Sequence, residues 1–286
     1  MSLGIAFKSP EGVILAADSR VTLTATLPQA QPVLPGTPSP PTVLLPCTYD
    51  NATKLLHVKS QPHIGAVTYG AAAIGIREPR TAHSYLPELE EIVNKEFPGK
   101  RMTVAEYAKV LSDFFMGKWT SQNMPTGPGQ DMIFLVGGYD FGGVYGKLFE
   151  IFIPNNPTPV ERCGSAGDFG MVWGGQREFA DRLVGGFDGR LPGMAQAFLS
   201  LDDAKRDALE AHLKGNLQTQ IPFAFLPLQD CVDLAIFLIR MTIVMQHWII
   251  GVRGVGGAVD VAVITQTSGF TEIQKKQLRG EESWQK

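Results

Sequence analysis

Three side chains in the first 54 residues have the types and surroundings that nucleophilic hydrolysis requires. Asp18 ends the apolar run 13–17, where a carboxylate either begins a turn or is held for a partner. Lys54 begins another apolar run, and a lysine on a core strand needs a carboxylate to offset the cost of burial. Ser2 follows Met1, and an initiator methionine is normally removed when the next residue is small. We therefore expect Asp18 and Lys54 to pair close to Ser2.

Removal of Met1 would place the Ser2 hydroxyl beside its own free α-amine. Such an amine has an ordinary pKa of about 7.7–8.0, so part of it is neutral at pH 7 and can act as a general base. A nearby Lys54 ammonium would lower the pKa of the hydroxyl, and Asp18 would orient that lysine. The three residues together predict a serine nucleophile that needs no histidine.

Four stretches around these residues, at 4–8, 12–20, 51–55 and 64–70, resemble the N-terminal half of proteasome-type β-subunits. That family consists of N-terminal-nucleophile hydrolases with an αββα sandwich, and its nucleophile is normally a threonine. The spacing from Ser2 to Asp18 matches the family without a gap, so the resemblance puts Ser2 in the nucleophile's position. The spacing from Asp18 to Lys54 is longer than in the family, and a proline-rich insertion accounts for the excess.

The same resemblance assigns roles to further residues. Lys54 falls on the family's catalytic lysine, and Gly70 falls on the glycine whose backbone N–H forms the oxyanion hole. Arg20, at the end of the second matching stretch, becomes a supporting residue. The loop 163–167 resembles the family's Gly-Ser-Gly loop, which assigns Ser165 to the support of the N-terminal amine. The later stretches 234–240 and 256–264 resemble the family's last helix and the strand that follows it.

Two departures from the family pattern concern the nucleophile itself. A serine replaces the usual threonine, which keeps the hydroxyl chemistry but removes the methyl group that restricts the threonine rotamer. The family also places an aspartate and a serine just before the glycine pair that corresponds to Gly256 and Gly257, and the stretch 251–255 supplies neither. Asp260 lies nearby but on a strand, and we assign it no role.

The elements that must position these residues follow from hydrophobic periodicity and turn signals. Strands are expected at 4–7, 13–17, 54–58, 64–69, 131–138, 147–153, 160–163 and 258–265, and helices at 81–97 with a break at Pro87, 104–119, 169–183, 202–213 and 228–247. Segregated runs of strands and helices favour an α+β fold. With the resemblance, they predict a four-layer αββα sandwich of two antiparallel sheets flanked by helices.

We expect one domain over residues 1–286 with two insertions. Seven prolines within 24–47 disfavour both helix and internal strand, so this insertion should be an extended loop. The second insertion covers roughly 185–222, which the resemblance largely leaves out. The run 234–250 contains Arg240, Gln246 and His247, which favours a buried helix over a membrane span.

Composition excludes several classes of function. With 25 basic and 28 acidic residues the net charge is −3, so nothing favours binding to nucleic acid or to an anionic membrane. The cysteines are Cys47, Cys163 and Cys231; their number is odd and they lie far apart, which fits a reducing cytoplasm better than a disulfide framework. The five histidines are scattered and make no metal-binding motif. We expect neither cofactor nor metal.

The resulting hypothesis is a cytoplasmic, proteasome-like, self-compartmentalising peptidase. The resemblance implies peptide or unfolded-protein substrates and a homo-oligomer of stacked rings, and it leaves any unfoldase partner undefined. Two alternatives remain open. A catalytically inactive ring or scaffold subunit is favoured if Met1 is retained, because the amine is then blocked. An N-terminal-nucleophile amidohydrolase for small molecules would use the same residues without an enclosed chamber.

Overall fold

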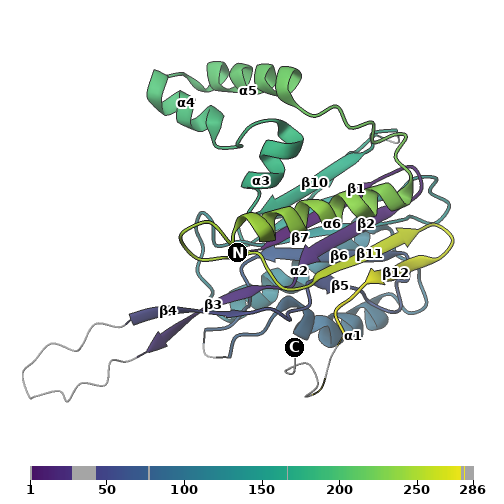
Figure 1. Cartoon of the computed structure of the whole chain (residues 1–286). Coiled ribbons are helices and arrows are strands. Elements are labelled where there is room, and N and C mark those ends of the chain that lie inside the picture. The colour runs from purple at the N-terminus through teal and green to yellow at the C-terminus, as the bar shows by residue number, and fades with distance from the viewer. Residues whose placement is uncertain (1, 28–42, 77, 166, 278–279, 281–286) are drawn as a thin grey trace, which may run out of the picture.

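Two five-stranded antiparallel sheets form the centre of the chain (Figure 1). The computed structural model describes residues 2–27, 43–76, 78–165, 167–277 and 280. The first sheet has the order β10-β1-β2-β11-β12 and consists of β1 (Leu3–Lys8), β2 (Val13–Asp18), β10 (Gly170–Gly175), β11 (Val259–Thr265) and β12 (Gly269–Gln274). The second has the order β5-β6-β7-β8-β9 and consists of β5 (Leu55–Leu56), β6 (Ile64–Gly70), β7 (Met132–Gly138), β8 (Lys147–Ile153) and β9 (Asn156–Arg162).

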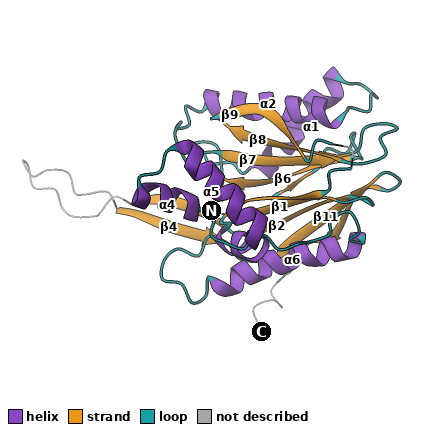
Figure 2. Ribbon diagram, turned by 90° about the horizontal axis from the view of Figure 1, so that it is seen from above, coloured by secondary structure: helices purple, strands orange, loops and turns teal. Residues whose placement is uncertain are grey.

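Helices cover the outer faces of both sheets, which makes four layers (Figure 2). The long helices are α1 (Leu86–Glu96), α2 (Val104–Ser121), α4 (Leu191–Leu199), α5 (Asp203–Leu217) and α6 (Leu228–Met245). One apolar core lies between the sheets and includes Leu15 and Val67. A second lies between the first sheet and α6 and includes Ile5, and a third lies between the second sheet and the α1–α2 pair and includes Phe115. The predicted α+β sandwich is confirmed.

The N-terminal hairpin shows why the sequence forms this layered structure. Every residue of β1 and β2 is buried, because the sheet is covered on both faces. Side chains alternate along a strand. Ala6 accordingly faces the second sheet, whereas Ile5 and Phe7 face α6. The turn between the strands closes with a 2.9 Å hydrogen bond from the Ser9 N–H to the Gly12 carbonyl.

Local signals fix the starts of the helices on the second sheet. The Thr103 hydroxyl accepts a hydrogen bond from the Glu106 N–H, and the Glu106 carboxylate accepts one from the Thr103 N–H, so α2 begins with a capping box. Pro87 lies in the first turn of α1, where a missing N–H costs nothing, directly after the 3₁₀ turn Ala82–Tyr85. The predicted break at Pro87 is this junction between the two helical pieces.

The structure corrects two expectations about the irregular regions. The proline-rich insertion is not a loop throughout, because its ends continue into a hairpin of β3 (Val21–Leu27) and β4 (Val43–Tyr49); residues 28–42 lie outside the described part of the chain. Pro46 is tolerated in β4 because the ribbon has only two strands. The predicted helix at 169–183 is in fact β10 followed by the short helix α3 (Glu178–Ala180) and a π-helical turn.

The second insertion contains a helical hairpin, α4 and α5, which projects from the first sheet beside α6 (Figure 1). The predicted helix at 202–213 is α5, and none of its residues is buried, as expected for a solvated helix. The predicted helix at 228–247 is α6, which buries one face that includes Ala235 and Leu238. Among the described residues, no helix combines the length and the apolar character that a membrane crossing would demand.

Candidate functional site

The carboxylate of Asp18 is the centre of the candidate site. Asp18 ends β2 and is completely buried. Its Oδ1 accepts hydrogen bonds from Lys54 Nζ at 2.7 Å and from the Leu3 N–H at 3.0 Å. Its Oδ2 accepts from the Arg20 N–H at 3.1 Å and from the Gly256 N–H at 3.0 Å. Four donors thus stabilise one buried negative charge, which explains why a carboxylate is tolerated at the end of an apolar strand.

Lys54 enters the site from the second sheet. It directly precedes β5, and its carbonyl accepts a 3.0 Å hydrogen bond from the Thr68 N–H of β6. Its side chain is 5% exposed, so the Asp18–Lys54 ion pair is buried and connects the two sheets. Burial lowers the pKa of Lys54 below its ordinary value, and the Asp18 carboxylate opposes that shift. The sequence prediction that these two residues pair is confirmed.

Ser2 lies at the same end of the first sheet. It precedes β1 and is 4% exposed. Its carbonyl accepts a 2.7 Å hydrogen bond from the Gln176 N–H, which follows β10. Gly175 has a φ of +96°, and a Cβ there would lie 1.9 Å from the Ser2 carbonyl oxygen, so only glycine permits this close approach. Ser2 and Lys54 line one small cavity together with Val21 of β3 and with Thr68 and Tyr69 of β6.

Gly70 ends β6, directly after a residue of that cavity. Its φ is +88°, and a Cβ would lie 2.3 Å from the Asp131 carbonyl oxygen, so the position requires glycine. The preceding residue, Tyr69, lines the cavity and donates a 3.0 Å hydrogen bond to the buried Glu150 carboxylate. Arg162 in turn binds Glu150 through Nε at 2.8 Å. These contacts hold the end of β6 in place, where the chain turns at Gly70.

The ring of Tyr69 also fits against β1, the strand that Ser2 precedes. A Cβ at Gly4 of β1 would lie 2.6 Å from the ring, and one at Gly174 of β10 would lie 2.2 Å from the hydroxyl. Both glycines therefore make room for the ring. Burial, with Glu150 beside it, holds the pKa of Tyr69 well above its usual value, so the phenol stays protonated and donates. Tyr69 thereby sets how far the Ser2 strand lies from the Gly70 strand.

Arg20 supports the site from outside. Its guanidinium makes a bidentate pair with Asp50, with Nε–Oδ1 at 2.5 Å and Nη2–Oδ2 at 2.7 Å. The pair raises the pKa of Arg20 and lowers the pKa of Asp50, chiefly through these hydrogen bonds. Gly256 packs against the guanidinium, where a Cβ would lie 2.4 Å from Cζ. Arg20 donates to Asp18 through its backbone N–H, and the Asp18 charge also contributes to the raised pKa of the guanidinium.

The assignment of Ser165 to the support of the Ser2 amine is wrong. Ser165 is exposed, and its carbonyl accepts a 2.8 Å hydrogen bond from Lys8 Nζ. Lys8 is the last residue of β1 and pairs with Gly170, whereas Ser2 lies beyond the first residue. Leu3 and Lys8 are five residue steps apart along the strand, which is about 17 Å. The Gly-Ser-Ala-Gly motif was misleading because it precedes β10, which pairs antiparallel with β1. The start of β10 therefore lies beside Lys8, and only its end lies beside Ser2.

Sequence reasoning missed a pair of glutamines at the Ser2 end. Gln176, whose N–H holds the Ser2 carbonyl, accepts a hydrogen bond through its side chain from Gln246 at the end of α6. The side-chain Oε1 of Gln246 in turn accepts a 3.0 Å hydrogen bond from the Val255 N–H. The stretch 251–255, which lacks the family's aspartate and serine, is thus tied to Ser2 through two carboxamides. Their only sequence signal was a glutamine inside the apolar run 234–250.

A second buried ion pair lies close to the first. Asp260 of β11 is 2% exposed and binds Lys276 Nζ, and its Oδ1 accepts a 3.0 Å hydrogen bond from the Lys276 N–H. Both charges act on Lys54 in opposite directions, Lys276 lowering its pKa and Asp260 raising it. Asp260 therefore anchors the segment after β12 and contributes to the field around Lys54.

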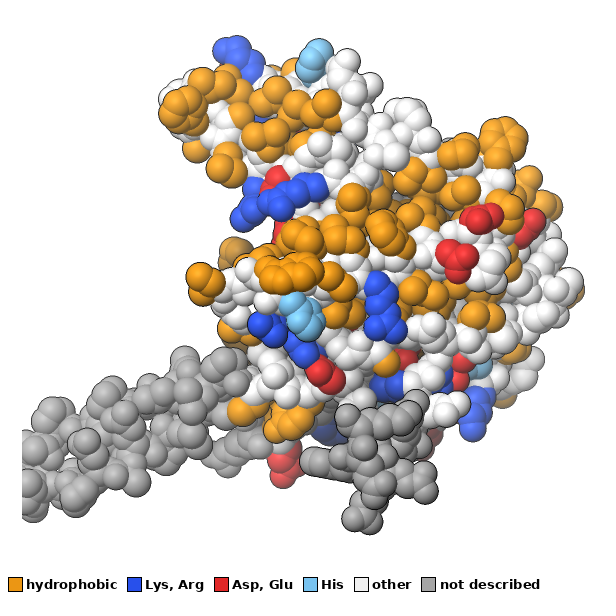
Figure 3. Space-filling model, in the orientation of Figure 1, with side chains coloured by type: hydrophobic (Ala, Val, Ile, Leu, Met, Phe, Trp, Pro, Cys, Tyr) orange, Lys and Arg blue, Asp and Glu red, His pale blue; other side chains and the backbone are white. Residues whose placement is uncertain are grey.

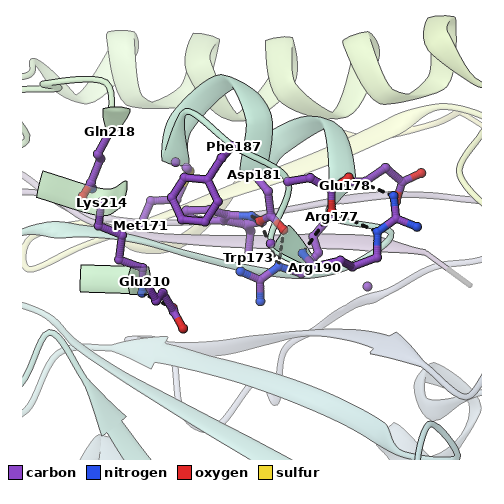
Figure 4. Close-up of a pocket in the computed structure, with 14 residues that line it drawn as sticks. Met171, Trp173, Arg177, Glu178, Asp181, Phe187, Arg190, Glu210, Lys214 and Gln218 are labelled. Atoms are coloured by element: carbon purple, nitrogen blue, oxygen red, sulfur yellow. Dashed lines mark hydrogen bonds and ion pairs between the residues drawn. The ribbon is translucent and has the colours of Figure 1, made fainter. Parts of the chain in front are cut away.

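A much larger cavity than the one at Ser2 lies elsewhere. It has a volume of about 730 Å³ and lies between β10 and the α4–α5 hairpin (Figure 4). Its lining includes Met171 and Trp173, whose side chains pack on the α6 side of the first sheet. Asp181 accepts hydrogen bonds there from Trp173 Nε1 and Arg177 Nε, both at 2.8 Å. The Ser2 cavity faces the second sheet, so the two cavities lie on opposite faces of the first sheet.

The arrangement has the chemical parts of an acyl-transfer site: a hydroxyl, a buried ammonium held by a carboxylate, and a strand end with a forced glycine conformation. Within the described residues, no group of three or more histidine, cysteine, aspartate or glutamate side chains is arranged to hold a metal ion. The chain matches no protein-family model, and a search of curated proteins finds no significant relative.

Proposed function

We propose that the chain is an N-terminal-nucleophile hydrolase of the proteasome β-subunit type, acting as an endopeptidase on peptides or unfolded proteins. The observation that carries the proposal is the meeting of Ser2, Lys54 and Asp18 at one end of the sandwich, from two sheets and from positions 52 residues apart in sequence. A purely structural ion pair would not need to share a cavity with a serine at the start of the chain.

In the proposed reaction Met1 is removed and the Ser2 α-amine becomes free. Ser2 Oγ attacks the scissile carbonyl carbon, and its proton passes to the α-amine. Lys54 stays protonated through its pair with Asp18 and lowers the pKa of the hydroxyl. The Gly70 N–H donates to the oxyanion. The C–N bond then breaks, the leaving amine takes the proton from the α-ammonium, and water hydrolyses the acyl ester with the amine again as base.

The test is turnover of a fluorogenic peptide by matched serine variants. We expect Ser2→Ala to abolish turnover, because no other hydroxyl carries the base on its own backbone. Ser165→Ala is the control: it removes the hydroxyl of the other motif serine, on the far end of β1, and turnover should be unchanged. Full activity of the Ser2→Ala variant would refute the proposed nucleophile. Loss of activity in Ser165→Ala would refute the placement of the site at the Ser2 end.

We further propose a homo-oligomer of stacked rings in the cytoplasm, which would enclose the Ser2 sites. The described cysteines are all unpaired, which supports a reducing compartment. The alternatives are an inactive ring or scaffold subunit and a small-molecule amidohydrolase. Retention of Met1 in the purified protein would favour the inactive subunit. Hydrolysis of small amides but not of peptides would favour the amidohydrolase.

A further inference from the structure

The peptide unit that joins Ser2 to Leu3 is held from both sides. Its carbonyl oxygen accepts the 2.7 Å hydrogen bond from the Gln176 N–H, and its N–H, that of Leu3, donates to Asp18 Oδ1 at 3.0 Å. A peptide unit is planar, so holding both of its polar groups fixes the plane that is bonded to the Ser2 Cα. The hydroxyl and the α-amine are carried by that carbon, and their orientation therefore depends on Gln176 and Asp18.

Further hydrogen bonds join these two contacts to each other. The side-chain oxygen of Gln176 accepts from Gln246 Nε2, and Gln246 Oε1 accepts from the Val255 N–H at 3.0 Å. The next N–H along the chain, that of Gly256, donates to Asp18 Oδ2 at 3.0 Å. The contacts close into a ring that passes through Ser2, Gln176, Gln246, Val255, Gly256, Asp18 and Leu3.

Gln246 connects this ring to another layer of the fold. It directly follows α6, is 5% exposed and uses both ends of its carboxamide in the ring. Gln176 lies at the edge of the cavity between β10 and the α4–α5 hairpin, because its exposed neighbours Gly175 and Arg177 line that cavity. The molecule is hollowed there, between the hairpin and the rest of the chain (Figure 3). Gln246 thus gives a residue at the edge of a hollow a buried contact with the end of α6.

We propose that Gln246 is a positioning residue for the reaction at Ser2. Through the Gln176 carboxamide it holds the Ser2 carbonyl, and with it the nucleophile, in the orientation that attack requires. The stretch 251–255 lacks the aspartate and the serine of the family pattern, and the carboxamide of Gln246 instead connects that stretch to Ser2 by directed hydrogen bonds without adding a charge. The inference rests on the proposed function.

The first test compares kcat and KM for a fluorogenic peptide in Gln246→Ala and Gln61→Ala. Gln61 is the matched control, because it is 2% exposed and also uses both ends of its carboxamide, donating to the Lys100 carbonyl and accepting from the Met102 N–H, both at 2.9 Å. We expect Gln246→Ala to lower kcat about 10–100-fold with KM unchanged, since a misplaced nucleophile loses the advantage of orientation. Gln61→Ala should change neither constant per folded molecule.

Gln176→Ala tests the same contact with less risk to folding, because Gln176 is only half-buried. It should lower kcat to a similar extent. The double variant with Gln246→Ala should be no slower than the slower single variant, because the two side chains act as one unit.

The second test does not use turnover. Hydrogen exchange at the backbone amides of Gln176 and Leu3 should be faster in Gln246→Ala than in the wild type, because the ring is broken, and should stay slow in Gln61→Ala. Wild-type kcat in Gln246→Ala, an equal loss in Gln61→Ala, additive losses in the double variant or unchanged exchange at Gln176 would each overturn the inference. A wild type without turnover would refute the proposed function, and the exchange rates would still decide whether Gln246 holds Ser2.

Discussion

Replacement of Asp18 by asparagine tests whether the site depends on a buried charge or only on its shape. The carboxylate accepts from Lys54 and Leu3 on one oxygen and from Arg20 and Gly256 on the other. An asparagine has the same size, but one of its ends is an NH₂ donor. Whichever way the amide turns, that donor faces two other donors. At least two buried N–H groups therefore lose their acceptor.

The expected magnitude follows from these contacts. Each orphaned buried donor costs about 1–3 kcal/mol, and a buried lysine without its partner costs about 3–5 kcal/mol. The two penalties overlap, because Lys54 can lose its proton, so we expect Asp18→Asn to lower the free energy of unfolding by about 5 kcal/mol. That is a third or more of the about 5–15 kcal/mol that stabilises a typical domain. Lys54→Met should cost less, since Asp18 then keeps three N–H donors.

The assay is urea unfolding followed by far-ultraviolet circular dichroism. The matched control is Asp50→Asn, which removes a charge from the other aspartate in contact with Arg20. Asp50 is 44% exposed, so its pair is worth at most about 1 kcal/mol. The double variant with Lys54→Met should lose less than the sum of the two single losses, because the variants share one interaction. If Asp18→Asn costs no more than Asp50→Asn, the four-donor account of Asp18 is refuted.

Two further predictions concern the packing and titration of the site. Gly174→Ala should lower the free energy of unfolding by about 1–3 kcal/mol in urea titrations, because its Cβ would lie 2.2 Å from the Tyr69 hydroxyl. Gly117→Ala in α2 is the control: its Cβ meets open space, so it should raise the free energy of unfolding by about 0.5–1 kcal/mol. Equal effects of the two variants would contradict the close packing of Tyr69 against Gly174. Because burial lowers the pKa of Lys54 below 10.5, turnover should fall on the alkaline side before pH 10.5 is reached. Between the lowered pKa of Lys54 and pH 10.5, the unfolded chain binds the Lys54 proton more tightly than the folded chain, so the free energy of unfolding should rise with pH. The Lys54→Met variant should lack this rise. If the difference in free energy of unfolding between the wild type and Lys54→Met does not change with pH, the lowered pKa is contradicted.

The layered fold could be predicted because its signals are local and consistent. The Thr103 capping box, the position of Pro87 and the continuous apolar runs of the first two strands each specify an element without long-range information. The pairing of Asp18 with Lys54 was also predictable, since a charge at the end of a buried strand has few ways to be satisfied. Both predictions depended on the properties of individual residue types, such as capping preference or the cost of burying a charge, and not on the path of the chain between distant segments.

The errors arose where long-range contacts decide. Nothing around Ser165 shows that β10 lies between it and Ser2, so a short motif was placed at the wrong end of β1. The run 169–175 reads equally well as a helix, and only its pairing with β1 makes it a strand. Gln176 and Gln246 come from separate segments and meet through their side chains, which no spacing in the sequence reveals.

The mass of the intact chain after treatment with a peptide epoxyketone tests the central claim most directly. Such a reagent requires a hydroxyl and a free amine on the same residue. We predict that the untreated chain begins at Ser2, that the treated chain gains the mass of one reagent molecule, and that the adduct maps to residue 2. A chain that keeps Met1, or one that begins at Ser2 and forms no adduct, would contradict the N-terminal nucleophile.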